Sequence, residues 1–416
     1  MTIQVISPES VGISSDRLAR IQPAIQRWID KGVIAGARMM LARRGALVYS
    51  EQVGQLDKEK GIAMPDDAIF RIYSMTKPIT CITLMTFYEE GRFRLDTPVA
   101  KFIPALGWLK VLNRDKPGAP RLEELQRPIT IGDLMKHTAG FTYDPVDDSP
   151  VAELYRQAEL TRNPGRSLAE FVHTLAEFPL VYQPGARWHY SVSIDVAAHL
   201  IEVLADKPLG EVFQERIFSP LGMVDTGFFV PKGKLSRCAA MYGCGDILAW
   251  NMTVLKMNEA YEKGLWGRVD VEDNYPSVRL ETFARGGHGL FSTTRDYLRF
   301  ILMLLDDGVL EETRILGRKT LELMHVNHLP AELLPLEDAG ITFDGYGFGL
   351  GSRTMLDVGA AGILSSVGEF GWGGAASTHY WVDPAEELVG VFMTQYQGFE
   401  EPDKDLQQLA YQSIVD

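Results

Sequence analysis

The chain has 416 residues, of which 46% are hydrophobic and 23% are charged. This composition is typical of a compact globular protein and excludes a disordered chain, a collagen and a coiled coil. There are 41 Lys and Arg residues against 55 Asp and Glu residues, a formal net charge of −14, so a nucleic-acid backbone would be repelled. At roughly 100 to 200 residues per domain, the length predicts two or three structural units that can bury a core and enclose a cleft.

The apolar stretches of the sequence are short. Stretches such as Ile79–Phe87 end well before the roughly 20 residues that a membrane-spanning helix needs. The segment Met1–Glu9 has neither the basic nor the apolar region of a signal peptide. The three cysteines, Cys81, Cys238 and Cys244, cannot all pair with one another. We therefore expect a cytoplasmic protein that has no membrane partner.

The N-terminal region predicts a helix followed by two strands. Apolar residues recur at three- and four-residue spacings over Ser14–Lys31, behind Ser and Asp side chains that can cap a helix. Residues 35–42 and 46–50 then have the pattern of two strands joined by a tight turn at Gly45. An antiparallel sheet is therefore expected to begin near the N-terminus.

The middle of the chain is dominated by helical spacing. One predicted helix starts near Ser74 and ends at Gly91, a residue typical of helix C-termini. Residues 113–128 contain prolines and predict an irregular stretch, and residues 224–290 are rich in loops. Further helices are predicted at Ile131–His137, Leu168–Glu177, Ser193–Leu204 and Thr293–Asp307.

The C-terminal region returns to strands. Residues 378–383 and 388–394 have strand character on either side of a short polar turn, and residues 404–415 can form a last helix. Strands at both ends and helices between them predict an α/β plus α fold, in which an antiparallel β-sheet is flanked by helices and carries a mostly helical insertion. The expected division is a mixed α/β domain of residues 1–95 and 330–416, a mainly helical domain of residues 96–220, and a loop-rich part of residues 221–329.

A Ser-x-x-Lys pattern lies at the start of the predicted helix near residue 74. Ser74 and Lys77 are three residues apart, so both side chains project from one face of the helix. A serine hydroxyl attacks a carbonyl group only when a base removes its proton, and a lysine with a lowered pKa can be that base. Taken alone, the pattern is more often a capping serine followed by a solvated lysine.

Two further segments carry residues suited to the same chemistry. Tyr190 follows a turn and precedes a predicted helix, and a phenol beside a lysine can move a proton. Taken alone, such a tyrosine is more often a half-buried aromatic residue. The glycine-rich stretch Gly371–Ala375 leads into the predicted C-terminal strands. Its glycines would let a substrate approach the backbone, and the N–H of Ala375 could donate to an oxyanion.

Several phrases together resemble one family in their residues and in their order along most of the chain. The family is that of the class C β-lactamases, the DD-peptidases and the family VIII carboxylesterases, and the sequence is most similar to the carboxylesterases. The phrases are Phe70–Pro78, Ile129–Phe141, Gln183–Ser191 and Ile217–Thr226.

The resemblance implies roles for particular residues. Ser74 would be the acylated nucleophile, Lys77 its proton partner, and Tyr190 the general base or proton shuttle. The backbone amides of Ser74 and Ala375 would form the oxyanion hole. Four further residues are expected to contact the substrate: Ser191, Trp372, Gly373 and Gly374. Neither a cofactor nor a metal ion is expected.

The sequence departs from the β-lactamases at two of their motifs. Where they have Tyr-x-Asn this chain has Tyr190-Ser191-Val192, and where they have Lys-Thr-Gly it has Trp372-Gly373-Gly374. The missing lysine would attract the carboxylate of a lactam, so a neutral ester fits the site better. We therefore expect a serine carboxylesterase for small or short-acyl esters, for which β-lactam hydrolysis is left open as a side activity. The alternatives are a β-lactamase or D-amino-acid peptidase, an acyltransferase of the same fold, and a silent binding protein.

Other candidate residues are weaker. His325 and His328 have a spacing that can hold a metal ion, but no cluster of further ligands accompanies them. His137 is interpreted as a histidine at a helix end that bonds a local carbonyl, and His288 as a residue near the site. Four apolar residues of the loop-rich part could line a pocket or belong to the core with equal weight: Trp250, Met252, Leu255 and Met257.

Overall fold

The computed structural model describes residues 5–113, 121–163, 165–247, 252–269, 284–338 and 340–416. At its centre is an eight-stranded sheet in which each pair of neighbouring strands is antiparallel. In spatial order the strands are β14 (Tyr346–Phe348), β15 (Arg353–Met355), β16 (Phe370–Gly374), β17 (Thr378–Asp383), β18 (Leu388–Thr394), β1 (Gly36–Arg43), β2 (Ala46–Asp57) and β3 (Ile62–Ala63).

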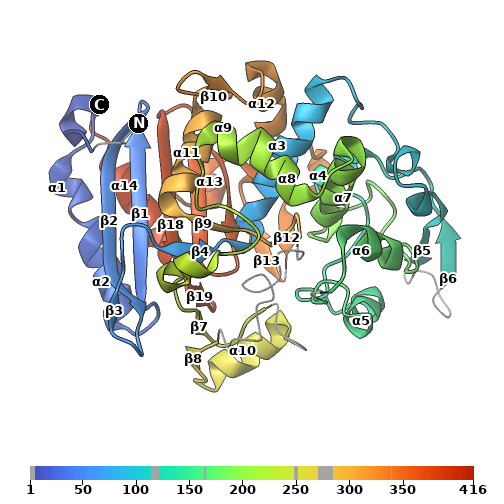
Figure 1. Cartoon of the computed structure of the whole chain (residues 1–416), viewed down its shortest axis with the longest axis horizontal. Helices are drawn as coiled ribbons and strands as arrows, with labels where there is room; N and C mark the ends of the chain where they lie inside the picture. The colour runs from blue at the N-terminus through green and yellow to red at the C-terminus, as the bar shows by residue number, and fades with distance from the viewer. Residues whose placement is uncertain (1–4, 114–120, 164, 248–251, 270–283, 339) are drawn as a thin grey trace.

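The two ends of the chain meet within the sheet, because the C-terminal β18 pairs with the N-terminal β1 (Figure 1). Two tight turns set the register on either side. Arg44 and Gly45 both have positive φ between β1 and β2, as a two-residue hairpin turn requires. Between β17 and β18, the Asp383 carboxylate accepts backbone N–H groups of Ala385 and Glu386. The predicted antiparallel sheet and its two hairpins are confirmed.

Helices cover both faces of this sheet. Along β1, Met39 and Leu41 point into a core shared with α2 (Ile21–Asp30) and α14 (Pro402–Gln412). Met40 and Ala42 point to the other face, into the large core that contains α11 (Thr294–Leu305). Successive residues of a strand face opposite sides, so a strand that is buried on both faces presents apolar residues to both, as β1 does from Met39 to Ala42.

The remaining helices and short sheets surround this framework. The other helices are α1 (Ser15–Leu18), α3 (Thr76–Glu89), α4 (Ile131–Met135), α5 (Pro150–Gln157), α6 (Leu168–Leu175), α7 (Ser193–Ala205), α8 (Leu209–Phe213), α9 (Ser219–Leu221), α10 (Val254–Glu262), α12 (Arg318–His325) and α13 (Val358–Ala361). The small sheets pair β4 (Ile69–Arg71) with β9 (Phe291–Thr293), β5 (Lys110–Asn113) with β6 (Arg121–Glu124), β10 (Val309–Leu310) with β11 (Thr313–Arg314), and β12 (Leu336–Asp338) with β13 (Ile341–Phe343), and they join β7 (Tyr242–Gly243) to β8 (Gly267–Arg268) and β19 (Tyr396–Gln397).

Three sequence-based expectations about elements were wrong in detail. The predicted N-terminal helix is two helices, α1 and α2, separated at Ala19 and Arg20. The glycine-rich stretch before the last hairpin is itself strand β16, because its backbone pairs with β15 and β17. The predicted irregular stretch contains strand β6, which pairs with β5 just before it, and residues 114–120 between the two strands lie outside the described residues. The domain boundaries at residues 95, 220 and 330 stay a prediction.

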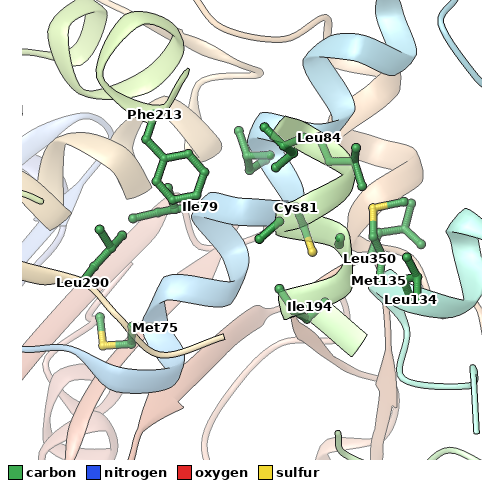
Figure 2. Packing of buried hydrophobic residues seen from close by; sticks show 14 of the residues in the cluster. Met75, Ile79, Cys81, Leu84, Leu134, Met135, Ile194, Phe213, Leu290 and Leu350 are labelled. Carbon is green, nitrogen blue, oxygen red and sulfur yellow. The ribbon is translucent and has the colours of Figure 1, made fainter. Parts of the chain in front are cut away.

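Helix α3 crosses the interior and is buried along nearly its whole length. Figure 2 shows apolar side chains from α4, α7 and α8 surrounding Ile79 and Cys81 of this helix. Full burial of an aliphatic side chain such as Ile79 stabilises the fold by roughly 1.5–3 kcal/mol. The N-terminal end of α3 is thereby held rigidly between the sheet and the helical part of the chain.

Candidate active site

The segment just before α3 is a short 3₁₀ turn, Tyr73–Met75, rather than the first turn of the helix itself. Tyr73 has a φ of +41°, in the left-handed region that costs a non-glycine residue about 1–2 kcal/mol. Its buried phenol accepts a hydrogen bond from Gln397 Nε2 at 2.7 Å and lies 3.3 Å from a carboxylate oxygen of Asp246. These contacts hold the unusual backbone conformation that presents the next residue, Ser74, at the end of the helix.

Three side chains meet at Ser74. The Ser74 Oγ lies 3.1 Å from Lys77 Nζ, which comes from the first turn of α3. Tyr190 precedes α7, and its hydroxyl donates a hydrogen bond of 2.8 Å to the same Ser74 Oγ. The structure thus brings together the three residues that the sequence singled out from two separate segments.

Lys77 is buried. Among the described residues, its ammonium group donates hydrogen bonds only to Ser74 Oγ and to one backbone carbonyl oxygen. Its ammonium group donates to the Gly287 carbonyl oxygen at 2.7 Å and lies 4.6 Å from the centre of the Tyr190 ring. Burial lowers the pKa of Lys77 to about 8, although the nearby Asp195 carboxylate acts in the opposite direction. An amine with such a pKa can lose its proton near neutral pH and act as a base.

Tyr190 is enclosed by aromatic rings. Burial raises its pKa above the ordinary value, so the phenol is kept in its protonated form, although hydrogen bonds with Ser74 and Trp372 act in the opposite direction. The indole Nε1 of Trp372 lies 3.4 Å from the Tyr190 hydroxyl oxygen, and the two rings are 5.5 Å apart. A protonated phenol that donates to Ser74 is suited to relaying a proton rather than to removing the first one.

Strand β16 runs beside the Ser74 segment. Gly374 approaches it so closely that a Cβ atom there would lie 2.3 Å from the Ile72 carbonyl oxygen. Only glycine fits this position, and the close approach puts Ala375 on the wall of the same cavity as Ser74. Backbone N–H groups at these two positions are suited to an oxyanion.

A cavity of about 470 Å³ opens above Ser74. Ser74, Tyr190, Trp372, Gly373 and Ala375 lie on its wall, whereas Gly374 faces Ile72. Tyr143, Phe343 and Tyr346 add an aromatic lining. The volume suits a small organic molecule.

Ser191 is not brought to the cavity wall. Its side chain is 2% exposed, its hydroxyl lies 2.7 Å from Ser193 Oγ, and its backbone N–H donates to His137 Nδ1 at 3.2 Å. The side chain therefore lies behind Tyr190, and the expected contact with a substrate stays a prediction.

Comparison with known proteins agrees with this geometry. The family model described as Beta-lactamase matches residues 21–412, nearly the whole chain. The chain belongs to the beta-lactamase family. Protein Rv1367c of Mycobacterium tuberculosis (strain ATCC 25618 / H37Rv) is 32% identical to it, over 90% of this chain and 89% of that protein. Esterase EstB of Burkholderia gladioli is 27% identical, over 97% of each.

Solved structures show the same fold for this beta-lactamase family member. EstCE1, described as a hydrolase with promiscuous acyltransferase activity, superimposes with a TM-score of 0.77 at 23% identity, covering 96% of this chain and 99% of EstCE1. The fold is therefore that of the beta-lactamases and transpeptidases, with an antiparallel sheet and flanking helices. Other relatives carry the names of acyltransferases and of a putative D-alanyl-D-alanine carboxypeptidase.

Of the other candidate histidines of this beta-lactamase family member, His137 and His288 are buried and His325 and His328 are half-buried. The ring nitrogens of His325 and His328 lie within 2.9 Å and 2.6 Å of backbone carbonyl oxygens of α12. Within the described ranges no three His, Cys, Asp or Glu side chains gather as they would around a metal ion. His288 lies on the cavity wall, and burial keeps its pKa well below the ordinary value. His137 lies just after the end of α4, as interpreted from the sequence, but its Nδ1 accepts the backbone N–H of Ser191 instead of the ring bonding a local carbonyl.

Of the four apolar residues singled out in the loop-rich part, the structure places two in or against the core. Met257 is buried in a cluster with Tyr73, and Met252 packs against that cluster. Leu255 is exposed, and Trp250 lies outside the described residues. No described helix of this family member is both long enough and apolar enough to cross a membrane.

Sequence reasoning missed two residues that hold Lys77. The Gly287 carbonyl accepts the lysine, and the Gly287 N–H donates to the buried Asp195 carboxylate at 3.0 Å. The glycine-rich run Arg285–Leu290 was the only signal in the sequence for this contact. Its structural reason is that a Cβ on Gly287 would lie 2.7 Å from Asp195 Oδ2. Asp195 itself has the appearance of an ordinary residue in the first turn of α7.

The pH dependence of turnover should reveal this arrangement. If neutral Lys77 removes the serine proton, kcat/KM rises about tenfold per pH unit below about 8 and levels off above it. Because the Asp195 carboxylate favours the charged amine, Asp195→Asn should move the apparent pKa downward while still accepting the Gly287 N–H. Rate profiles between pH 5 and pH 10 on both proteins test this expectation, and an upward move of the midpoint would contradict it.

Proposed function

We propose that this protein is a serine carboxylesterase that hydrolyses small or short-acyl esters through an acyl-enzyme on Ser74. The observation that carries the proposal is the meeting of Ser74 Oγ with Lys77 Nζ at 3.1 Å and with the Tyr190 hydroxyl at 2.8 Å on the wall of a cavity. A nucleophile, a base of lowered pKa and a proton relay in mutual contact are the parts that acyl transfer needs.

The proposed reaction has two steps. Ser74 Oγ attacks the ester carbonyl carbon while its proton passes to neutral Lys77, and the developing oxyanion accepts hydrogen bonds from the Ser74 and Ala375 N–H groups. The tetrahedral intermediate then breaks the bond to the alcohol, which receives the proton by way of Tyr190. Water attacks the acyl-enzyme carbonyl in the same manner and gives a proton to Lys77. The bond between the acyl carbon and Ser74 Oγ then breaks, Oγ takes up that proton, and the acid is released.

The charges around the cavity support a neutral ester over an anionic lactam or peptide. Carboxylates of Asp338, Asp344 and Asp403 lie on the wall. The two cations of the wall have carboxylate partners: Arg353 lies 3.5 Å from Glu369 and Lys404 lies 2.8 Å from Glu401. Trp372 stands where the β-lactamases carry a lysine. An anionic substrate would therefore meet more negative than unpaired positive charge.

Mass spectrometry together with a substrate panel tests the proposal. The protein is exposed briefly to a fluorophosphonate, and turnover of p-nitrophenyl esters of increasing acyl length is compared with turnover of a cephalosporin. A phosphonyl adduct on Ser74 and ester turnover that exceeds cephalosporin turnover are expected.

Three outcomes contradict it. Cephalosporin turnover well above ester turnover would favour a β-lactamase. Transfer of the acyl group to an added alcohol in preference to water would favour an acyltransferase. A folded protein without an adduct would favour a binding protein.

A further inference from the structure

We propose that His137 is a positioning residue that holds Tyr190 in hydrogen-bonding range of Ser74; the proposal rests on the proposed function. His137 follows α4 and Tyr190 precedes α7, and the two segments lie side by side. The His137 carbonyl oxygen accepts the backbone N–H of His189 at 2.9 Å. Its ring Nδ1 accepts the backbone N–H of Ser191 at 3.2 Å. One residue thus binds the chain immediately before and immediately after Tyr190.

The His137 ring also contacts the Tyr190 ring directly. The ring centres are 4.7 Å apart, and the His137 side chain is completely buried. Trp188 and Phe348 contact the same imidazole edge-on at 6.4 Å and 5.6 Å. The imidazole therefore fills the space behind Tyr190, so Tyr190 cannot retreat from Ser74 without displacing several packed rings.

The backbone at His137 is adapted to this double contact. Its φ is +56°, a left-handed conformation in which His and Asn are enriched among non-glycine residues. The following residue, Thr138, is anchored on both sides: its hydroxyl donates to Asp133, and its carbonyl accepts the Gly185 N–H. The left-handed turn is thus held in place by its neighbours and directs both the His137 carbonyl and the ring toward the Tyr190 segment.

The imidazole is suited to accepting a hydrogen bond throughout the pH range of activity. Burial, with smaller contributions from Lys77 and His189, holds the pKa of His137 well below its ordinary value. Nδ1 is therefore unprotonated, as acceptance of the Ser191 N–H requires, and the ring proton resides on Nε2. Nε2 has no hydrogen-bond partner among the described residues. The contacts of His137 are thus with the Tyr190 segment, and it acts through Tyr190.

Two substitutions separate the acceptor from the bulk of the ring. Asn at position 137 tolerates the left-handed backbone and offers a side-chain oxygen to Ser191. Leu fills space but offers no acceptor. A displacement of about 1 Å at a reacting group can lower a rate by about 10²-fold, so we expect His137→Leu to lower kcat by up to about 10²-fold with little change in KM. We expect His137→Asn to recover part of that loss. The exposed His173 of α6 provides a matched control, and His173→Leu should leave kcat unchanged.

A double-mutant cycle with Tyr190→Phe decides whether the effect passes through Tyr190. The kcat loss from each His137 variant should largely disappear in the Tyr190→Phe background, measured with a p-nitrophenyl ester. An equal loss in both backgrounds, or a change in KM alone, would overturn the proposal. If the Leu variant does not fold, the cycle with His137→Asn carries the test, with thermal unfolding as the check on folding. If the wild type hydrolyses the ester and the effects of the two substitutions are additive, this proposal alone is wrong. If the wild type shows neither turnover nor labelling, the proposed function is wrong as well.

Discussion

Ser74→Ala is expected to lower ester turnover by roughly 10⁴- to 10⁶-fold, the scale on which loss of a catalytic serine acts in serine hydrolases. Without Oγ no acyl-enzyme can form, and the remaining oxyanion donors and cavity supply only a small part of the rate. The substitution should have little effect on stability, because Lys77 keeps its hydrogen bond to the Gly287 carbonyl. The measurements are kcat with a p-nitrophenyl ester and the mass of the protein after fluorophosphonate treatment.

A matched control is available in Ser236, an exposed serine of the 3₁₀ turn Lys232–Arg237. Ser236→Ala should keep full turnover and label as the wild type does. Turnover of Ser74→Ala within tenfold of the wild type, or an adduct that survives the substitution, would show that another residue is the nucleophile.

The second large effect is expected at Lys77. Lys77→Met keeps an unbranched chain in the buried site but removes the amine, and loss of a general base typically lowers a rate by 10²- to 10⁴-fold. The pH dependence below about 8 should disappear with it, because that midpoint belongs to the lysine. The rate of fluorophosphonate labelling, followed against pH, measures the activation of Ser74 separately from the later release of the acid.

Lys77→Arg distinguishes a base from a fixed charge. A guanidinium stays protonated at every accessible pH, so it can supply positive charge but cannot remove the serine proton. We expect this variant to be as slow as Lys77→Met. Labelling by the Arg variant at a rate close to that of the wild type would mean that Lys77 acts by its charge alone. Thermal unfolding of both variants checks that the helix start is intact, since either one disturbs the lysine's contact with the Gly287 carbonyl.

Features that depend on neighbours in the chain could be predicted from the sequence. Ser74 and Lys77 lie three residues apart at a helix start, so local geometry alone brings them together. The hairpin of β17 and β18 was predicted with its observed bounds, because the alternation of residues and the turn between the strands are local signals. The exact ends of helices could not be predicted from the sequence. Helix α3 begins at Thr76, because contacts with distant residues hold Tyr73–Met75 in a 3₁₀ turn.

The contact of Tyr190 with Ser74 could be predicted from the sequence only through resemblance to a family, because 116 positions separate the two residues. Its approach to Ser74 depends on how the helical part packs against α3. The contacts of Gly287, Asp195 and His137 could not be predicted, since each one joins a side chain to a backbone group of a distant segment. Periodicity and composition carry no information about which backbone carbonyl or N–H group a side chain will meet.

By itself, then, the sequence determined an antiparallel sheet that joins both ends of the chain, a Ser-x-x-Lys pair at the start of one helix, and a family whose members carry out acyl chemistry. The tertiary structure decided what surrounds that pair. It buries Lys77 so that its pKa falls to about 8, it encloses Tyr190 between His137 and Trp372, and it opens a cavity above Ser74. The physical reason is that burial and enclosure arise from segments far apart in the sequence, whose contacts exist only when the sheet and the helices have packed together.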